Sequence, residues 1–145
     1  MLHKFISRVR PPKSGRDSDA PNEGYPVVDP YFWTPKVGVN FGDYLASAVV
    51  QRMLAARELL VNEPVSRHRR LFSVGSVLHF AQTGDTIWGT GRNGKIAVDR
   101  HRFETLDIRA VRGPLTRRFL NELGHSVPEI YGDPALLIPK IFPNR

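Results

Sequence analysis

The stretch LDIRAVRGPLTRRFLNELG, residues 106–124, contains a strand signal, a turn and a helix signal in direct succession. Its first residues predict a strand near 107–111. Gly113-Pro114 then predicts the start of a helix near 114–123, because proline fits the first helical turn, and Gly124 predicts its end. The apolar stripe of that helix is expected to be buried, and it holds Leu115, Phe119 and Leu123.

The same alternation runs through the rest of the chain. Further strands are predicted near 31–34, 71–75, 86–89 and 129–131. A helix is predicted near 43–60, with Asp43 or Asn40 as its N-cap. Strands that alternate with helices or tight glycine turns favour an α/β fold, a Rossmann-like lobe with a mostly parallel sheet covered on both faces. The apolar face of the first helix is formed by Leu45, Ala46, Val49, Val50, Met53 and Leu54.

The composition is that of one ordinary globular domain. The chain has 145 residues, of which 41% are hydrophobic and 24% charged, so a disordered chain or a coiled-coil rod is excluded. It has no cysteine, which excludes disulfides, cysteine zinc sites and thiol nucleophiles. No apolar run approaches the roughly 18 residues of a membrane span, and no secretory signal is present.

The chain is basic, with a net charge of +7, and arginine outnumbers lysine among its 21 basic residues. Arginine suits phosphate and carboxylate, so this excess favours anionic ligands; a GC-rich genome would produce the same excess, and both explanations stay open. Basic residues are not interleaved with aromatic ones along one face. We therefore expect no nucleic-acid partner.

Residues 1–30 predict a flexible, basic and proline-rich leader, followed by one lobe over 31–145. Within the first ten residues, Leu2, Phe5, Ile6 and Val9 follow helical spacing between basic residues. Such a segment would lie on an anionic membrane surface, pack on the core or fray, and the sequence leaves these alternatives open.

The glycines after the third strand match two nucleotide-binding patterns incompletely. Gly89, Gly91 and Gly94 fit G-x-G-x-x-G, but no amphipathic helix follows, as a dinucleotide site requires. The same loop fits G-x-x-x-x-G-K, but Ile96 stands where a P-loop needs Ser or Thr. The loop is better explained as a turn that brings backbone close to a ligand or to another chain segment.

Polar residues follow the predicted strands where ligands gather in an open parallel sheet. Asp43 and Asp133 would equally serve as helix caps, and His79 would equally fill the core. A nucleophile elbow is absent, and so is metal-ligand spacing such as H-x-x-x-H, so no metal site is predicted. The catalytic candidates are Asp43 and His79, and the substrate-binding candidates are Asn40, Gly42, Gly75, Ser76, Gly89, Gly91, Arg112 and Asp133.

These turns carry a resemblance to a known family. Five blocks occur in order: Asn40-Phe41-Gly42-Asp43, Ser73-Val74-Gly75-Ser76-Val77-Leu78-His79-Phe80-Ala81, Gly84-Asp85-Thr86-Ile87-Trp88-Gly89-Thr90-Gly91, Arg109-Ala110-Val111-Arg112-Gly113-Pro114 and Tyr131-Gly132-Asp133-Pro134. Together they resemble the amino-terminal half of the polysaccharide pyruvyl transferase family, most closely the ketal pyruvate transferases of exopolysaccharide synthesis such as the xanthan enzyme. The likeness extends to Asn93-Gly94-Lys95-Ile96 and Leu106-Asp107-Ile108.

The resemblance implies a transferase. Phosphoenolpyruvate would donate its pyruvyl group to two hydroxyls of a terminal hexose on a lipid-linked oligosaccharide, forming a ketal and releasing phosphate. It implies no cofactor, and a cytoplasmic location at the inner face of the membrane, with peripheral membrane contact. The oligomeric state stays open, a homo-oligomer included.

The likeness covers only half of a two-Rossmann enzyme of the glycosyltransferase-B kind. Family members are about twice as long, and their donor-binding residues belong to the carboxyl-terminal half. We therefore expect this chain to be an acceptor-side lobe that does not transfer pyruvate alone. The alternative is an inactive remnant that binds glycan or a partner protein.

Overall fold

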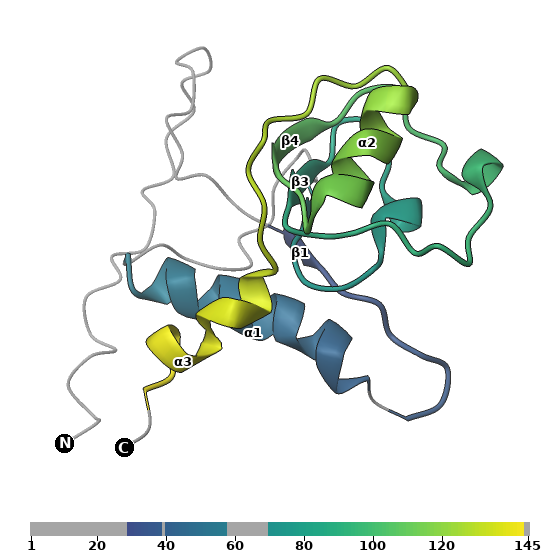
Figure 1. Ribbon diagram of the computed structural model, residues 1–145. Coiled ribbons are helices and arrows are strands. Elements are labelled where there is room, and N and C mark those ends of the chain that lie inside the picture. The colour runs from purple at the N-terminus through teal and green to yellow at the C-terminus, as the bar shows by residue number, and fades with distance from the viewer. Residues whose placement is uncertain (1–28, 39, 58–69, 144–145) are drawn as a thin grey trace, which may run out of the picture.

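The computed structural model describes residues 29–38, 40–57 and 70–143, which contain a four-stranded sheet with helices beside it (Figure 1). The strands lie in chain order and every neighbouring pair is parallel. The predicted α/β class, a Rossmann-like lobe on a parallel sheet, is confirmed. The strands are β1 (Asp29–Tyr31), β2 (Arg70–Phe72), β3 (Thr86–Trp88) and β4 (Asp107–Ala110).

The helical elements follow the strands in alternation. The first and longest helix begins after Asn40, whose side chain accepts a hydrogen bond from the Gly42 N–H, so Asn40 is the N-cap. This settles the choice that the sequence left between Asn40 and Asp43. The α-helices are α1 (Phe41–Ala55), α2 (Pro114–Glu122) and α3 (Ile138–Ile141), and the 3₁₀ turns are η1 (Leu78–Phe80), η2 (Val98–Arg100) and η3 (Pro134–Leu137).

Helices pack against both faces of the sheet. Successive side chains of a strand point to opposite faces. Leu71 and Trp88 line a groove together with residues of α1. Phe72 and Ile87, their neighbours along the same strands, belong instead to the main apolar core with Phe119 of α2. The rest of that core includes Val77, Leu78, Ala81, Phe103, Val111, Leu120 and Val127.

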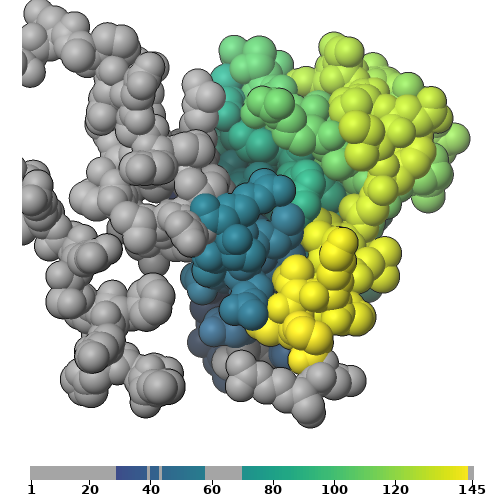
Figure 2. Space-filling model, turned by 90° about the vertical axis from the view of Figure 1, so that its left-hand side faces the viewer, coloured from purple at the N-terminus to yellow at the C-terminus, as the bar shows by residue number. Residues whose placement is uncertain are grey.

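The carboxyl-terminal segment returns to lie along α1. In Figure 1 it runs from the end of α2 past the sheet to α3, and in Figure 2 it lies against α1. The Nε of Arg52 donates to the Ile141 carbonyl at 3.2 Å, and its guanidinium lies 5.9 Å from the Phe142 ring centroid. These contacts hold the last turn of α1 against the end of α3.

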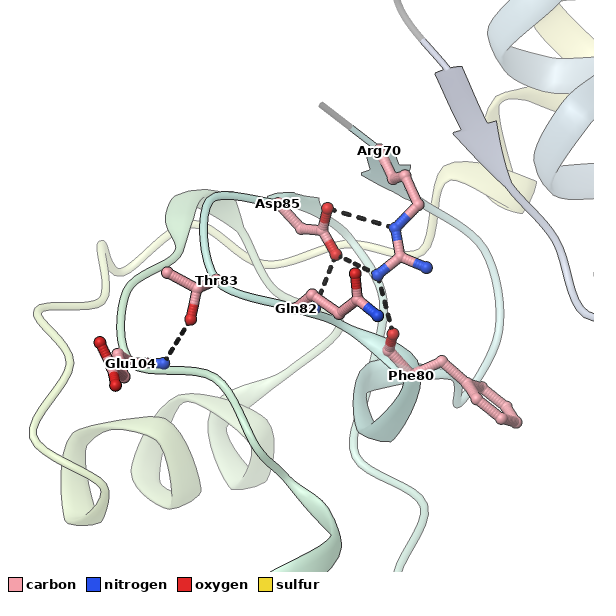
Figure 3. A network of polar contacts seen from close by, with 6 residues as sticks. All are labelled: Arg70, Phe80, Gln82, Thr83, Asp85 and Glu104. Atoms are coloured by element: carbon pink, nitrogen blue, oxygen red, sulfur yellow. Dashed lines mark hydrogen bonds and ion pairs between the residues drawn. The ribbon is translucent and has the colours of Figure 1, made fainter. Parts of the chain in front are cut away.

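A buried ion pair holds the amino ends of the central strands (Figure 3). Asp85, just before β3, accepts from Arg70 Nη2 at 2.6 Å, from Arg70 Nε at 3.3 Å and from the Gln82 N–H at 2.7 Å. Arg70 also donates to the Phe80 carbonyl at 3.0 Å. This network fixes the segment that connects β2 to β3 through η1, and it lies at the opposite strand ends from the predicted site.

The predicted stripe of α2 is partly wrong. Phe119 is buried as expected, but Leu115 is 72% exposed and Leu123 is also exposed. A helix holds 3.6 residues per turn, so a stripe at steps of four drifts by about 40° with each step. The buried side of α2 is turned by that drift and consists of Thr116, Phe119 and Leu120.

Two strand predictions also need correction. The first strand lies two residues earlier than predicted, because only Tyr31 of the run 31–34 belongs to β1. Pro30 is accepted there because β1 is an edge strand. The predicted strand 129–131 is a single parallel bridge between Val111 and Tyr131. Pro128 has no N–H to extend the ladder, and the chain turns away after the bridge towards η3.

The remaining boundaries agree to within a few residues. The strands predicted near 71–75, 86–89 and 107–111 start within one residue of the prediction and end one to three residues early. Helix α1 ends at Ala55 rather than near residue 60. The predicted leader lies outside the described residues, apart from its last two positions in β1. Among the described residues, no helix combines the length and the apolar character that crossing a membrane would demand.

Candidate functional site

A cleft of about 570 Å³ opens at the carboxyl ends of the strands. Parallel strands end at the same edge of a sheet, so the loops that follow them meet there. Six of the predicted site residues line this strand-end cleft: Asn40, Gly42, Gly75, Ser76, His79 and Asp133. Its remaining lining residues are Trp33, Val74, Val77, Phe80 and Asn93.

Two polar residues of the cleft also cap helical turns. The Asn40 Oδ1 accepts from the Gly42 N–H at 3.0 Å, and the Asp133 Oδ1 accepts from the Ala135 N–H at 3.0 Å. Both capping roles were weighed from the sequence, and both are confirmed. A carboxylate has about four acceptor sites, so the Asp133 cap leaves acceptor capacity for a ligand.

Arg112, in the loop after β4, contacts the loops that follow β2 and β3. Its Nη1 donates to the Ser76 Oγ at 2.6 Å, and its Nη2 donates to the Arg92 carbonyl at 3.3 Å. A Cβ at Gly91 would overlap the Arg112 guanidinium. Gly91 therefore makes room for this arginine, and it does not line the strand-end cleft. Its role as a substrate contact stays a prediction.

Thr90 joins the loops after three strands. Its hydroxyl donates to the Gly75 carbonyl at 2.9 Å, and its own carbonyl accepts from the Arg112 N–H at 3.2 Å. The Gly91 N–H also donates to the Gly75 carbonyl, at 3.0 Å. Thr90 is fully buried, so these bonds are shielded from water. Gly75 itself has a φ of 101°, a conformation that favours glycine.

Gly89 brings two chain segments together. Its φ is 96°, and a Cβ at this position would overlap Cδ and Cγ of Pro134. The close approach predicted for this loop is therefore made to another segment of the chain. Gly89 does not line the strand-end cleft, and its role in substrate binding stays a prediction.

The loop after β3 contains none of the helix that nucleotide binding needs. No helix begins at Gly94; the next element is the single 3₁₀ turn η2. A dinucleotide fingerprint and a P-loop both require a helix that starts within the loop. The loop therefore lacks the helix on which a nucleotide-binding enzyme would depend.

His79 lies half-buried in η1, at the side of the cleft. Its ring centroid is 4.0 Å from that of Phe80, and its Nδ1 is buried with no hydrogen-bond partner among the described residues. Burial lowers the pKa of His79, and the nearby charges of His101 and Arg100 lower it further. The imidazole is therefore neutral at neutral pH, the form that accepts a proton.

The catalytic role predicted for Asp43, beside that of His79, stays a prediction. Asp43 lies in the first turn of α1, next to Gly42 of the cleft, but its side chain lies outside what the structure describes. Arg112 reaches the same region through Ser76 rather than by lining the cleft itself. The structure thus places Asn40 and His79 on one cleft and Arg112 beside it.

Five residues that line the cleft are absent from the predicted site: Trp33, Val74, Val77, Phe80 and Asn93. Trp33 falls within the predicted strand 31–34, and the other four fall within segments that carry the family resemblance. None of the five carries a local signal that distinguishes a cleft residue from an ordinary loop or core residue. Within the described ranges, no group of three His, Asp or Glu residues is arranged to hold a metal ion.

Comparisons with protein-family models, with curated proteins and with solved structures gave no match.

Proposed function

We propose that this chain forms the acceptor side of a pyruvyl transferase of exopolysaccharide biosynthesis. The observation that carries the proposal is the composition of the strand-end cleft. Its polar residues come from blocks far apart in the sequence, each of which contributes to the family resemblance. Those residues are Asn40 and Gly42, Gly75, Ser76 and His79, Asn93, and Asp133.

The cleft suits a hexose in size and chemistry. Its volume, about 570 Å³, lies within the range of about 300–1,000 Å³ that is usual for small-molecule sites. The partly exposed Trp33 offers an aromatic face to the C–H groups of a sugar ring. Asn40, Ser76 and Asp133 offer hydrogen-bonding groups to its hydroxyls.

The reaction needs a proton acceptor on the acceptor side. One hexose hydroxyl oxygen attacks C2 of phosphoenolpyruvate, the methylene carbon gains a proton, phosphate leaves, and the second hydroxyl closes the ketal. Of the two hydroxyl protons, one balances the new methyl group and the other leaves with phosphate. Neutral His79 is the group in the cleft that we assign to accept a hydroxyl proton.

Transfer can be tested in cells that carry the natural protein, by measuring phosphate release from phosphoenolpyruvate with a lipid-linked oligosaccharide acceptor. The variant His79→Ala should lower turnover about a hundredfold, as removal of a general base does. Its free energy of unfolding should change little. Unchanged turnover, or a variant that unfolds, would show that His79 has only a packing role.

A second measurement separates transfer from simple binding. A methyl hexoside titrated into the chain should shift the amide resonances of Gly75 and Ser76 and the indole resonance of Trp33. Hexoside binding by the chain, together with unchanged transfer in cells from which the gene for this chain is deleted, would establish the alternative, an inactive glycan-binding protein. Absence of both would refute the proposed function.

A further inference from the structure

A second cavity, of about 470 Å³, lies on the far side of Arg112 from the strand-end cleft. Its wall combines the loop after β3, the loop after β4 and the exposed side of α2. Three arginines contribute to this wall, together with apolar and hydroxyl groups. The residues that matter for the argument are Arg92, Arg112, Leu115, Thr116, Arg118 and Phe119.

Two of these arginines have no acidic partner. Neither Arg92 nor Arg112 forms an ion pair with any described residue, although both are half-buried. Glu122 is the acidic residue of the wall, and its Oε1 lies 3.8 Å from the Nε of Arg118. Partly buried charge is unfavourable unless it is paired, so an anionic ligand would stabilise this arrangement.

Arg92 is held in place by groups that leave its guanidinium donors free. The guanidinium carbon lies 4.2 Å from the Phe119 ring centroid. The backbone N–H of Arg92 donates to the Thr116 hydroxyl at 3.2 Å. The Nε of Arg92 is buried and has no hydrogen-bond partner within the part of the chain that the structure describes. A ring-stacked guanidinium with free donors presents the planar fork that suits phosphate and carboxylate.

Arg112 is oriented in a similar way by neutral partners. It gives one donor to Ser76 and one to the Arg92 carbonyl, which leaves three of its five N–H donors. The backbone carbonyl of Arg92 thus joins one arginine to the guanidinium of the other. The Arg112 side chain is thereby joined to the backbone of Arg92, whose own side chain is stacked on Phe119.

We infer that Arg92 and Arg112 form a binding site for a phosphate- or carboxylate-bearing ligand in the second cavity. The Ser76–Arg112 hydrogen bond is part of the wall between this cavity and the strand-end cleft. A ligand with a sugar in the cleft and a phosphate in the cavity would contact both. Only this link to phosphoenolpyruvate or to the acceptor diphosphate rests on the proposed function; the anion site itself rests on the arginines.

The inference is tested by titrating three probes into the 145-residue chain at constant ionic strength: inorganic phosphate, pyrophosphate and phosphoenolpyruvate. Amide resonances of Gly94 and Thr116 should shift saturably, with dissociation constants of about 1 mM. Arg92→Gln and Arg112→Gln should each weaken binding about tenfold, through loss of charge-assisted hydrogen bonds. Arg109→Gln, which removes an equal charge from an exposed position, should change it less than about twofold.

A variant on the cavity wall tests the site without disturbing its arginines. Leu115 is well exposed, so neither Leu115→Glu nor Leu115→Gln should affect folding. Leu115→Glu should abolish binding by repulsion, whereas Leu115→Gln should retain it. Equal losses of anion binding in the two Leu115 variants, or in Arg92→Gln and Arg109→Gln, would overturn the inference. Shifts by the three probes that do not differ from those caused by chloride would overturn it as well.

The probes also separate the sources of the anion. Tighter binding of phosphoenolpyruvate than of pyrophosphate would identify the donor substrate, and the reverse order would identify a diphosphate-bearing acceptor. Phosphate binding by the chain, together with unchanged transfer in cells from which the gene for this chain is deleted, would sustain the site and refute the proposed function. Transfer activity that survives Arg92→Gln, in a protein that binds no phosphate, would refute the anion site and sustain the proposed function.

Discussion

Replacing Asp85 by Asn is expected to destabilise the protein strongly. The substitution keeps the shape of the side chain and removes its charge. The carboxylate is only 5% exposed and accepts three hydrogen bonds, two from Arg70 and one from the Gln82 N–H (Figure 3). In the variant, the Arg70 charge stays in place without its counter-charge.

The magnitude follows from how well Arg70 is compensated. Removing one partner of a fully buried ion pair costs about 3–5 kcal/mol. Arg70 is 21% exposed and keeps its bond to the Phe80 carbonyl, so water and that carbonyl offset part of the loss. We therefore expect Asp85→Asn to lower the free energy of unfolding by about 2–3 kcal/mol. A typical domain has only about 5–15 kcal/mol in total.

Urea unfolding, followed by tryptophan fluorescence and by circular dichroism, measures this loss. Asp107→Asn is the matched control, since Asp107 pairs at 2.7 Å with Arg109, whose side chain is 69% exposed. The control should lose less than about 1 kcal/mol. A loss below about 1 kcal/mol in Asp85→Asn, or one equal to that of the control, would refute the reasoning.

Three further expectations concern the stability of substituted proteins. Gly89→Ala should destabilise by more than about 1–2 kcal/mol, the usual strain of left-handed backbone, because the new Cβ also overlaps its neighbouring segment; wild-type stability in urea would contradict this. Burial lowers the pKa of both His79 and His101 below 6.5, so the unfolded chain binds more protons. Stability should therefore fall as the pH drops below about 6.5 towards the folded-state pKa values, and replacing both histidines by Gln should flatten that profile. Phe119→Ala should lower the free energy of unfolding by about 3–5 kcal/mol, because its side chain is buried. Leu115→Ala should lower it by less than about 0.5 kcal/mol, because that side chain is exposed. Similar thermal shifts in the two variants would count against the observed rotation of α2.

The sequence was sufficient where the signal lies within a few residues. The Gly113-Pro114 turn predicted the start of α2, and the short polar residues before an apolar run narrowed the cap of α1 to Asn40 or Asp43. Alternation of strands with helices predicted the parallel sheet. Because parallel strands end at one edge, this topology alone predicted that Asn40, Gly75 and His79 would lie around one cleft.

Boundaries and helix rotation were harder to predict from the chain. The apolar spacing of residues 115, 119 and 123 is compatible with more than one buried side of α2, and contact with the sheet selected Thr116 and Leu120. The last predicted strand has a suitable sequence, yet a neighbouring proline reduced it to one bridge at Tyr131. Local propensity is a weak signal that tertiary contacts override.

Only the tertiary structure decided which loop residues line the strand-end cleft and which support the fold. Gly89 and Gly91 look alike in the sequence, but one accommodates Pro134 and the other the Arg112 guanidinium. Arg112 meets Ser76, which lies 36 positions earlier in the chain. Contacts of such long range depend on how the sheet brings separate loops together, and no spacing within a single segment encodes them.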